Sequence, residues 1–229
     1  RFGKVPFVPG WKTADDPKLL GKAVWAYAEG LGARFEKALV ERVEAGPAGA
    51  VLHLADGTTR QARRVVIAAG AWSHLLAKNL GDSIPLETER GYNTTLPKTA
   101  FDVKRQLIFS GHGFVITPLE TGLRVGGAVE LGGLDRPPNF ARSKAMLEKA
   151  RRFLPGLDPS GGHEWMGFRP SLPDSLPVIG ASRAANIFYA FGHGHLGKTQ
   201  AAATGRLIRD LVLGQTPPLD PTPFNPQRF

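Results

Sequence analysis

The sequence predicts an α+β fold made of two parts, one mixed and one mainly antiparallel. Three observations predict it. Apolar residues recur at helical spacing near residue 20, after residue 139 and near the end of the chain. Alternating segments broken by an Asp-Gly turn fill residues 33–69. From residue 84 to about 133, short β-prone pieces are separated by glycine and proline, which indicates a second sheet with its own hydrophobic face.

The first part begins with a helix and continues as an antiparallel meander. Asp16-Pro17 supplies an N-cap followed by proline at the first helical position, and Gly32 ends the helix. The Asp56-Gly57 turn separates two of the strands that follow. The run Val65–Ala69 is continuously apolar, as expected of a strand covered on both faces. The expected strands are Ala33–Val43, Val51–Leu54 and Ala62–Ala69.

The second part and the end of the chain show similar patterns of strands, turns and helices. The expected strands of the second sheet are Tyr92–Leu96, Gln106–Phe109, Gly113–Pro118 and Leu123–Val129. Asn139 is expected to cap a helix to Leu154, and loops are expected over Pro155–Gly162 and Gly167–Gly180. A strand over Ile187–Phe191, a glycine-rich turn and an amphipathic helix follow. The proline-rich tail from Thr216 is expected to cross the surface without secondary structure.

The composition is that of a globular protein and excludes several kinds of site. Of 229 residues, 42% are hydrophobic and 21% are charged, and the lack of cysteine excludes disulfides, thiolate zinc sites and iron–sulfur clusters. The net charge is +9, but the basic residues are scattered, so we expect no nucleic-acid partner. No apolar run approaches the roughly 20 residues that span a bilayer. We expect a cytoplasmic protein, with peripheral contact at the inner membrane face left open.

Residues 192–199, Gly-His-Gly-His-Leu-Gly-Lys-Thr, match two phosphate-binding patterns between a strand and a helix. They fit the P-loop, G-x-x-x-x-G-K-T, and the dinucleotide fingerprint, G-x-G-x-x-G. Both patterns need later strands that carry a magnesium-binding aspartate or a ribose-binding acid. Only a helix and the proline-rich tail follow Thr199, and Asp210 lies within that helix. A glycine-rich turn without a ligand is the third interpretation.

His193 and His195 in the same stretch form an H-x-H pair. Zinc needs further ligands, and His112, His163 and Glu164 are the candidates. None of them has the spacing of a metal ligand, so we expect no metal site. No G-x-S-x-G, H-E-x-x-H or serine–lysine pattern occurs either, and the sequence predicts no catalytic nucleophile.

Three segments, Val65–Trp72, Gly167–Gly180 and Ile187–Val212, together resemble the FAD-dependent D-amino-acid oxidoreductases. That family includes D-amino-acid dehydrogenase, glycine oxidase and sarcosine oxidase, and the resemblance runs from about Asp15 to Phe229. It implies FAD as cofactor and an amino-acid substrate. The implied reaction oxidises a D-amino acid, or a secondary amine such as D-hydroxyproline, by hydride transfer to flavin, giving an imino acid.

The resemblance also implies a domain division. Residues 1–83 and 171–229 would form part of a FAD-binding domain, and residues 84–170 a substrate domain. Members of the family begin with a strand, a G-x-G-x-x-G turn and a helix that hold the ADP half of FAD. No such pattern precedes Asp15. We therefore expect an incomplete portion of the enzyme that needs the missing N-terminal segment and binds FAD weakly or not at all alone.

Three residues are expected at the substrate. Arg169 is similar to the family's carboxylate-binding arginine, since a planar guanidinium meets a carboxylate in a bidentate fork; a structural arginine under the Pro170 turn is the alternative. Tyr92 would donate a second hydrogen bond to the carboxylate, or is a buried sheet tyrosine. Lys198 would add positive charge near flavin or substrate, or is a solvated lysine.

The glycine-rich turn is expected at the flavin. The resemblance implies that it lies against the pyrimidine edge, where a helix N-terminus favours the negative charge of reduced flavin. The expected cofactor-binding residues are Ala69, Gly70, Trp72, Gly192, His193, Gly194, His195, Leu196 and Gly197. Two rival functions stay open, a P-loop nucleotide hydrolase and a non-catalytic remnant or binding module. The electron acceptor, whether oxygen, a quinone or a partner subunit, stays open as well.

Overall fold

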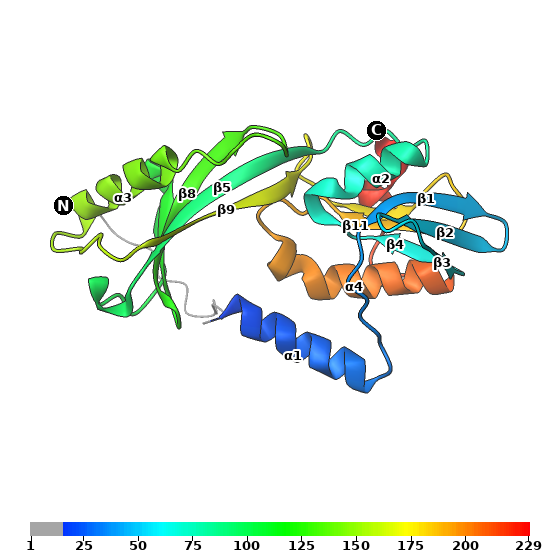
Figure 1. Ribbon diagram of the computed structural model, residues 1–229, viewed down its shortest axis with the longest axis horizontal. Coiled ribbons are helices and arrows are strands. Elements are labelled where there is room, and N and C mark those ends of the chain that lie inside the picture. Colours follow the sequence, from blue (N-terminus) through cyan, green and yellow to red (C-terminus); the bar gives the residue numbers. More distant parts are fainter. Residues whose placement is uncertain (1–15) are drawn as a thin grey trace. The chain divides into compact units, whose positions relative to one another are not determined.

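The computed structural model describes residues 16–229, and these divide into two compact units (Figure 1). The first unit contains residues 16–35, 92–128 and 139–165, and the second contains residues 36–91, 129–138 and 166–229. Each unit has its own hydrophobic core. The boundaries differ from the predicted ones, 1–83 and 171–229 against 84–170. Three long strands account for much of the difference, because each contributes residues to both units.

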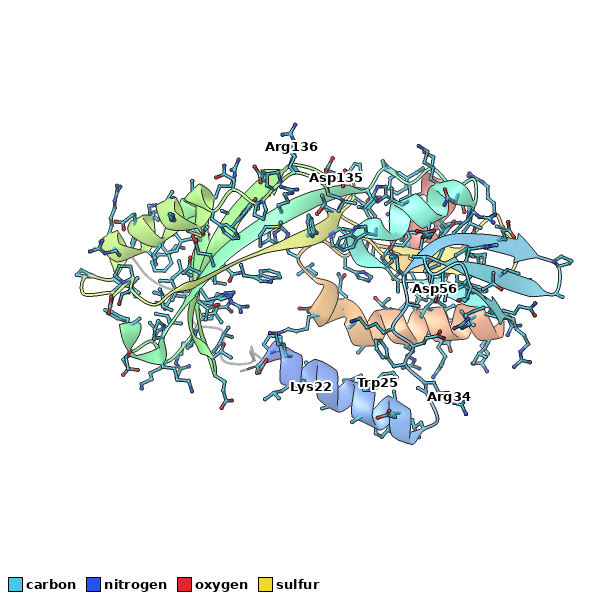
Figure 2. The ribbon with its side chains drawn as sticks, viewed as in Figure 1. Lys22, Trp25, Arg34, Asp56, Asp135 and Arg136 are labelled. Atoms are coloured by element: carbon cyan, nitrogen blue, oxygen red, sulfur yellow. The ribbon has the colours of Figure 1, made fainter. Side chains whose placement is uncertain are left out.

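The second unit opens with a three-stranded antiparallel meander. Its strands β1 (Val40–Gly46), β2 (Gly49–Leu54) and β3 (Thr59–Ala62) lie in that order. The turn between β2 and β3 is the predicted Asp-Gly turn, in which the backbone N–H and hydroxyl of Thr58 donate to Asp56 at 2.9 and 2.7 Å. Gly57 in this turn adopts a φ of +82°, which favours glycine. The side chain of Asp56 is labelled in Figure 2. The strand predicted over Ala33–Val43 begins only at Val40.

A second sheet of the same unit joins strands that lie far apart in the sequence. Its order is β10 (Val178–Ala181), β11 (Ile187–Phe191) and β4 (Val65–Ile67), with β11 parallel to β4 and antiparallel to β10. The short helix η1 (Gly70–Trp72) and α2 (Ser73–Asn79) follow β4. The long helix α4 (Gly197–Leu213) packs against β10 and β11, as Figure 1 shows in orange. The core of this unit almost fully buries four residues of β10 and β11, namely Val178, Ile187, Tyr189 and Phe191.

The third sheet has five strands in the order β6-β7-β8-β5-β9. The strands are β5 (Glu87–Leu96), β6 (Leu107–Phe109), β7 (Phe114–Leu119), β8 (Gly122–Leu131) and β9 (His163–Ser171). The first four were predicted, although β5 begins five residues earlier than expected. The loop predicted over Gly167–Gly180 is wrong, because this stretch contains the end of β9 and the start of β10. The loop was predicted because Pro170 is typical of loops. Pro170 is the last residue but one of β9, where a missing N–H interrupts the hydrogen-bond ladder least.

Among its described residues, the first unit carries the α-helices α1 and α3. In α1 (Pro17–Gly30), Asp16 accepts a hydrogen bond from the Lys18 backbone at 2.7 Å, which confirms the predicted N-cap. The described part of the chain buries no residue of α1, whose Lys22 and Trp25 are labelled in Figure 2. In contrast, α3 (Ala141–Phe153) packs Met146 and Ala150 into the core of this unit. The remaining short helices of the unit are η2 (Lys98–Ala100) and η3 (Ser110–His112).

The proline-rich tail is ordered, contrary to the prediction. It forms two short helical turns, η4 (Thr222–Phe224) and η5 (Pro226–Arg228). Pro226 is buried against Gly180, and the Gln227 amide donates to the Ala181 carbonyl at 3.1 Å. Arg228 also pairs with Asp174 at 2.7 Å. Proline fixes φ without preventing a 3₁₀ turn, so the tail packs on the edge strand β10.

Candidate functional site

Arg169 lies on β9 with its guanidinium stacked over the backbone of Gly91 on the neighbouring strand β5. A methyl group at Gly91 would overlap the central carbon and both terminal nitrogens of that guanidinium. Nη1 of Arg169 is buried, and no described residue hydrogen-bonds to it. Burial lowers the pKa of Arg169, and the charge of Glu89 opposes that shift. A half-buried guanidinium with unused donors is suited to bind an anion.

Arg90, the neighbour of Gly91, is an arginine of the opposite kind. Its side chain is fully buried and donates to the backbone carbonyls of Gly133, Pro137 and Arg136. Glu130 lies 3.8 Å from it, and the guanidinium stands 5.6 Å from the centre of the Phe168 ring. Figure 2 labels Asp135 and Arg136 in the segment held this way. Arg90 is therefore a structural residue whose donors are already used.

The glycine-rich turn between β11 and α4 is tied directly to the strand that carries Arg169. The N–H of Gly194 donates to the carbonyl of Pro170 at 2.8 Å. Gly192 and Gly194 have φ values of +85° and +51°, which favour glycine. A methyl group at Gly192 would lie 2.5 Å from Leu172, so the turn also needs glycine for close packing. The turn and Arg169 thus belong to one part of one unit.

The N-terminus of α4 presents backbone donors that no side chain caps. Leu196 occupies the N-cap position and makes no side-chain hydrogen bond there. The uncapped N–H groups of a helix start carry partial positive charge and attract anions. Gly197 begins the helix, and Leu196 and Lys198 are exposed beside it. The predicted positive charge of Lys198 therefore stands on the first turn of this helix.

The two histidines of the turn have different surroundings. Nε2 of His193 lies 2.9 Å from the hydroxyl of Thr204 on α4, and burial lowers the pKa of this histidine. His193 therefore fastens the turn to its own helix. Nε2 of His195 lies 3.7 Å from the Glu89 carboxylate, and more than half of the His195 side chain is exposed. Of the two, His195 is the one that faces the surroundings of Arg169.

Glu89 is the residue of this group that the sequence reasoning missed. It lies on β5 two positions before Gly91, so both point to the same face of the sheet as the guanidinium of Arg169. Only 26% of its side chain is exposed. The sequence does show that Glu89 precedes Gly91 by two residues, which places both on one face if they belong to a strand. The predicted strand began at Tyr92 and so left Glu89 out.

Ala69, Gly70 and Trp72 follow β4 as predicted. Gly70 has a φ of +57°, and a methyl group built on it would meet nothing within 4 Å. Ala69 is exposed beside it. The half-exposed Trp72 packs edge-to-face on Phe168, with ring centres 5.3 Å apart. The end of β4 is thus open to a close neighbour at Gly70, whereas Trp72 has a packing contact.

Tyr92 belongs to the first unit and is almost fully buried. Its hydroxyl accepts a hydrogen bond from the backbone N–H of Asn139 at 3.1 Å, and its ring packs edge-on against Phe140. These contacts favour the alternative interpretation of Tyr92 as a buried sheet tyrosine. We therefore leave it out of the site built around Arg169.

A model of the family described as FAD dependent oxidoreductase matches residues 3–211 of the chain. The chain belongs to this family. The family membership confirms the resemblance seen in the sequence and identifies FAD as the cofactor of the family. It also replaces the P-loop interpretation of residues 192–199, which form the turn before α4 and the first residues of that helix.

Relatives of the FAD-dependent oxidoreductase family with curated names cover most of this chain. It is 40% identical to a D-amino-acid oxidase of Bradyrhizobium diazoefficiens over 169 residues, 72% of this chain and 40% of that protein. It is 37% identical to a D-amino acid dehydrogenase of Paramagnetospirillum magneticum over 196 residues, 84% of this chain and 46% of that protein. The chain therefore spans less than half of the length of these two relatives.

Solved structures of the family share the fold. The glycine oxidase of Geobacillus kaustophilus superposes with a TM-score of 0.76 at 26% identity, covering 90% of this chain and 57% of that one. The L-proline dehydrogenase of P. horikoshii superposes with a TM-score of 0.79 at 23% identity, covering 93% and 60%. These likenesses support the α+β class that the sequence predicted.

Among residues 16–229, no three histidine, aspartate or glutamate side chains are arranged to hold a metal ion. No helix there is both long enough and apolar enough to cross a bilayer.

Proposed function

We propose that the protein oxidises a D-amino acid, or a secondary amine such as D-hydroxyproline, to the imino acid with FAD as hydride acceptor. Arg169 binds the substrate carboxylate in this proposal. The observation that carries it is the guanidinium stacked on Gly91 with a buried, unpartnered Nη1. The names of the two curated relatives, a D-amino-acid oxidase and a D-amino acid dehydrogenase, support the choice of substrate class.

The residues near Arg169 and at the end of β4 would fit a flavin. A group with a flat face needs close approach to backbone, and Gly70 offers open space at a positive φ. Negative charge on such a group needs donors, and the uncapped start of α4 offers them beside Gly194 and Gly197. Ala69, His195, Leu196 and Lys198 would line the same surroundings. FAD, when bound, supplies the acceptor for the hydride that leaves the substrate α-carbon.

The chain's own residues bind and orient the substrate. A bidentate pair between Arg169 and a carboxylate fixes both the position and the plane of the α-carbon, which a single contact does not. The amine must be neutral when the hydride leaves, since its lone pair forms the new C=N bond. Hydride transfer needs neither a nucleophile nor a metal ligand, so the lack of a catalytic triad pattern in the sequence is compatible with the proposal.

The function is tested by anaerobic titration of the full-length enzyme loaded with FAD, called the FAD-loaded protein below, with D-amino acids. We expect the visible flavin absorbance to bleach as substrate is oxidised. In Arg169→Lys the second-order rate constant for flavin bleaching by the substrate should fall roughly 10- to 100-fold. The reason is that a lost charge-assisted hydrogen bond costs about 1.5–3 kcal/mol. The melting temperature should change little, since no described residue hydrogen-bonds to the lost Nη1.

Arg206→Lys is the matched control, because Arg206 is exposed on α4. Its bleaching rate should equal that of the parent protein. Equal rates in the parent and in Arg169→Lys would contradict the carboxylate role. A failure of every D-amino acid and secondary amine to bleach the flavin would contradict the function itself.

We also propose that the ADP half of FAD is held by another segment of the same enzyme. This chain covers only 40% and 46% of the length of the two curated relatives, which supports this proposal. Electrons would leave the flavin to oxygen, a quinone or a partner subunit, and contact with the inner membrane face would serve a quinone acceptor. A comparison of turnover with oxygen and with a soluble quinone would separate these acceptors.

A further inference from the structure

Glu89 and Arg169 place two opposite charges on one face of neighbouring strands without joining them. The strands β5 and β9 are adjacent in the sheet, and the guanidinium covers Gly91, two residues after Glu89. Among residues 16–229, no hydrogen bond joins the two side chains and no ion pair within 4 Å connects them. The charge of Glu89 is nonetheless near enough to act on the Arg169 guanidinium. The two charges thus lie on one face of the sheet and do not contact each other directly.

The Glu89 carboxylate has hydrogen-bonding capacity that the described residues do not use. Its one close polar neighbour is Nε2 of His195 at 3.7 Å, beyond hydrogen-bonding distance. About three quarters of the Glu89 side chain is nevertheless covered. The carboxylate oxygens are not among the buried polar atoms of the described residues that lack a partner, so they stay open to a donor from a ligand. Glu87, two residues earlier on β5, differs, because it is exposed and accepts from the Thr88 backbone at 2.8 Å.

An α-amino acid carries both complementary charges on one carbon. Its carboxylate matches the unused donors of Arg169, and its ammonium matches the unused acceptors of Glu89. Simple carboxylic acids satisfy only the arginine and would leave the glutamate without a donor, and hydroxy acids offer the glutamate a neutral O–H donor instead of an ammonium. A site built to hydrogen-bond an N–H group rejects analogues that lack it, because its own polar group stays unpaired.

We propose that Glu89 is a specificity-determining residue that binds the substrate's α-ammonium, so that Arg169 and Glu89 together recognise the zwitterion. This inference rests on the proposed function and names the feature that restricts the substrate to amino acids. It assigns binding to Glu89; the bound ammonium then gives up its proton to water before the hydride leaves, as the neutral amine requires. His195, beside Glu89, would then contact the same end of the substrate.

The test uses two ligands that differ only in the charged group and that flavin cannot oxidise. One is 2-amino-2-methylpropanoate, which has no α-hydrogen. The other is 2,2-dimethylpropanoate, in which a methyl group replaces the ammonium at nearly the same size. Dissociation constants are measured from the change in visible flavin absorbance of the FAD-loaded protein and, independently, by calorimetry. The quantity compared is the ratio of the two constants in each variant.

In Glu89→Gln we expect the dissociation constant of the amino ligand to rise at least about tenfold, as for loss of a charge-assisted hydrogen bond. The dissociation constant of 2,2-dimethylpropanoate should stay the same or fall, because the negative charge of Glu89 then no longer competes with the ligand carboxylate for Arg169. Glu89→Asp keeps the charge and should restore part of the preference for the amino ligand. Glu87→Gln removes an equal charge from the same strand and should leave the ratio unchanged.

The outcomes separate the inference from the proposed function. If Glu89→Gln shifts both constants by the same factor, or neither, the ammonium role is overturned while Arg169 keeps its own. An equal shift in Glu87→Gln would overturn it too, because the effect would then be general electrostatics. If Arg169→Lys leaves the binding of both ligands intact, or the parent binds neither, the carboxylate site and the inference fail together. A ratio that changes in Glu89→Gln and recovers in Glu89→Asp supports it even if stability falls.

Discussion

Two arginines on adjacent strands illustrate how surroundings decide the role of a residue. Arg90 is fully buried and donates to three carbonyls, whereas Arg169 is half-buried and has a buried nitrogen without a partner. A buried donor without an acceptor costs about 1–3 kcal/mol, so such a group is rarely kept for stability alone. The contrast separates the candidate ligand-binding arginine from the structural one without reference to any relative.

Gly91 has a specific steric role under Arg169. Its φ is not in the left-handed region, so alanine is allowed by the backbone, but the added methyl group would overlap the guanidinium. We expect Gly91→Ala to displace Arg169 and to raise the dissociation constant of 2,2-dimethylpropanoate about tenfold, with a stability cost of about 1–3 kcal/mol. Ligand titration and urea unfolding measure the two effects.

Gly205→Ala is the control for this prediction. Gly205 lies within α4, where a methyl group would meet nothing within 4 Å. The substitution should leave ligand binding unchanged and raise stability by about 0.5–1 kcal/mol, as expected for glycine replaced in a helix. Unaltered binding in Gly91→Ala would show that the guanidinium position does not depend on Gly91.

At the scale of elements, the turn between β11 and α4 is held from two sides. Gly194 donates to Pro170 at the end of β9, and His193 reaches Thr204 on α4. The sequence was sufficient to predict this strand, turn and helix from apolar spacing and glycines. It was not sufficient for β9, because Pro170 and Pro173 are typical of loops, and the strand forms only because β5 lies beside it. Tertiary pairing overrode local preference there.

The buried His193 predicts a pH dependence of stability. Its pKa in the folded protein is lowered by burial, so below about pH 6.5 the unfolded chain binds a proton that the folded chain does not. The free energy of unfolding should therefore fall as the pH drops below 6.5. We expect His193→Gln to reduce this slope, measured by urea unfolding from pH 7.5 to 5.

His163→Gln removes an exposed histidine of β9 and serves as the comparison. Its slope should equal that of the parent protein. If the slopes of His193→Gln and the parent coincide, burial does not hinder protonation of His193 in the folded state.

At the scale of the whole molecule, the α+β class, the family and its cofactor were all predictable from sequence. Each rested on local patterns, such as the apolar run at β4 and the glycines after β11. The domain boundaries were less accessible, since β5, β8 and β9 each contribute to both units. The acidic partner Glu89 was missed for a related reason. Its role depends on which strand lies beside β5, and no pattern within the strand reports that neighbour.

The binding of a substrate carboxylate by Arg169 is tested most directly by a crystal structure of the FAD-loaded protein with 2-amino-2-methylpropanoate. The account predicts both carboxylate oxygens about 3 Å from the terminal nitrogens of Arg169, on the face of the sheet that Gly91 occupies. A ligand carboxylate bound by other groups, with Nη1 of Arg169 still lacking a partner, would contradict it.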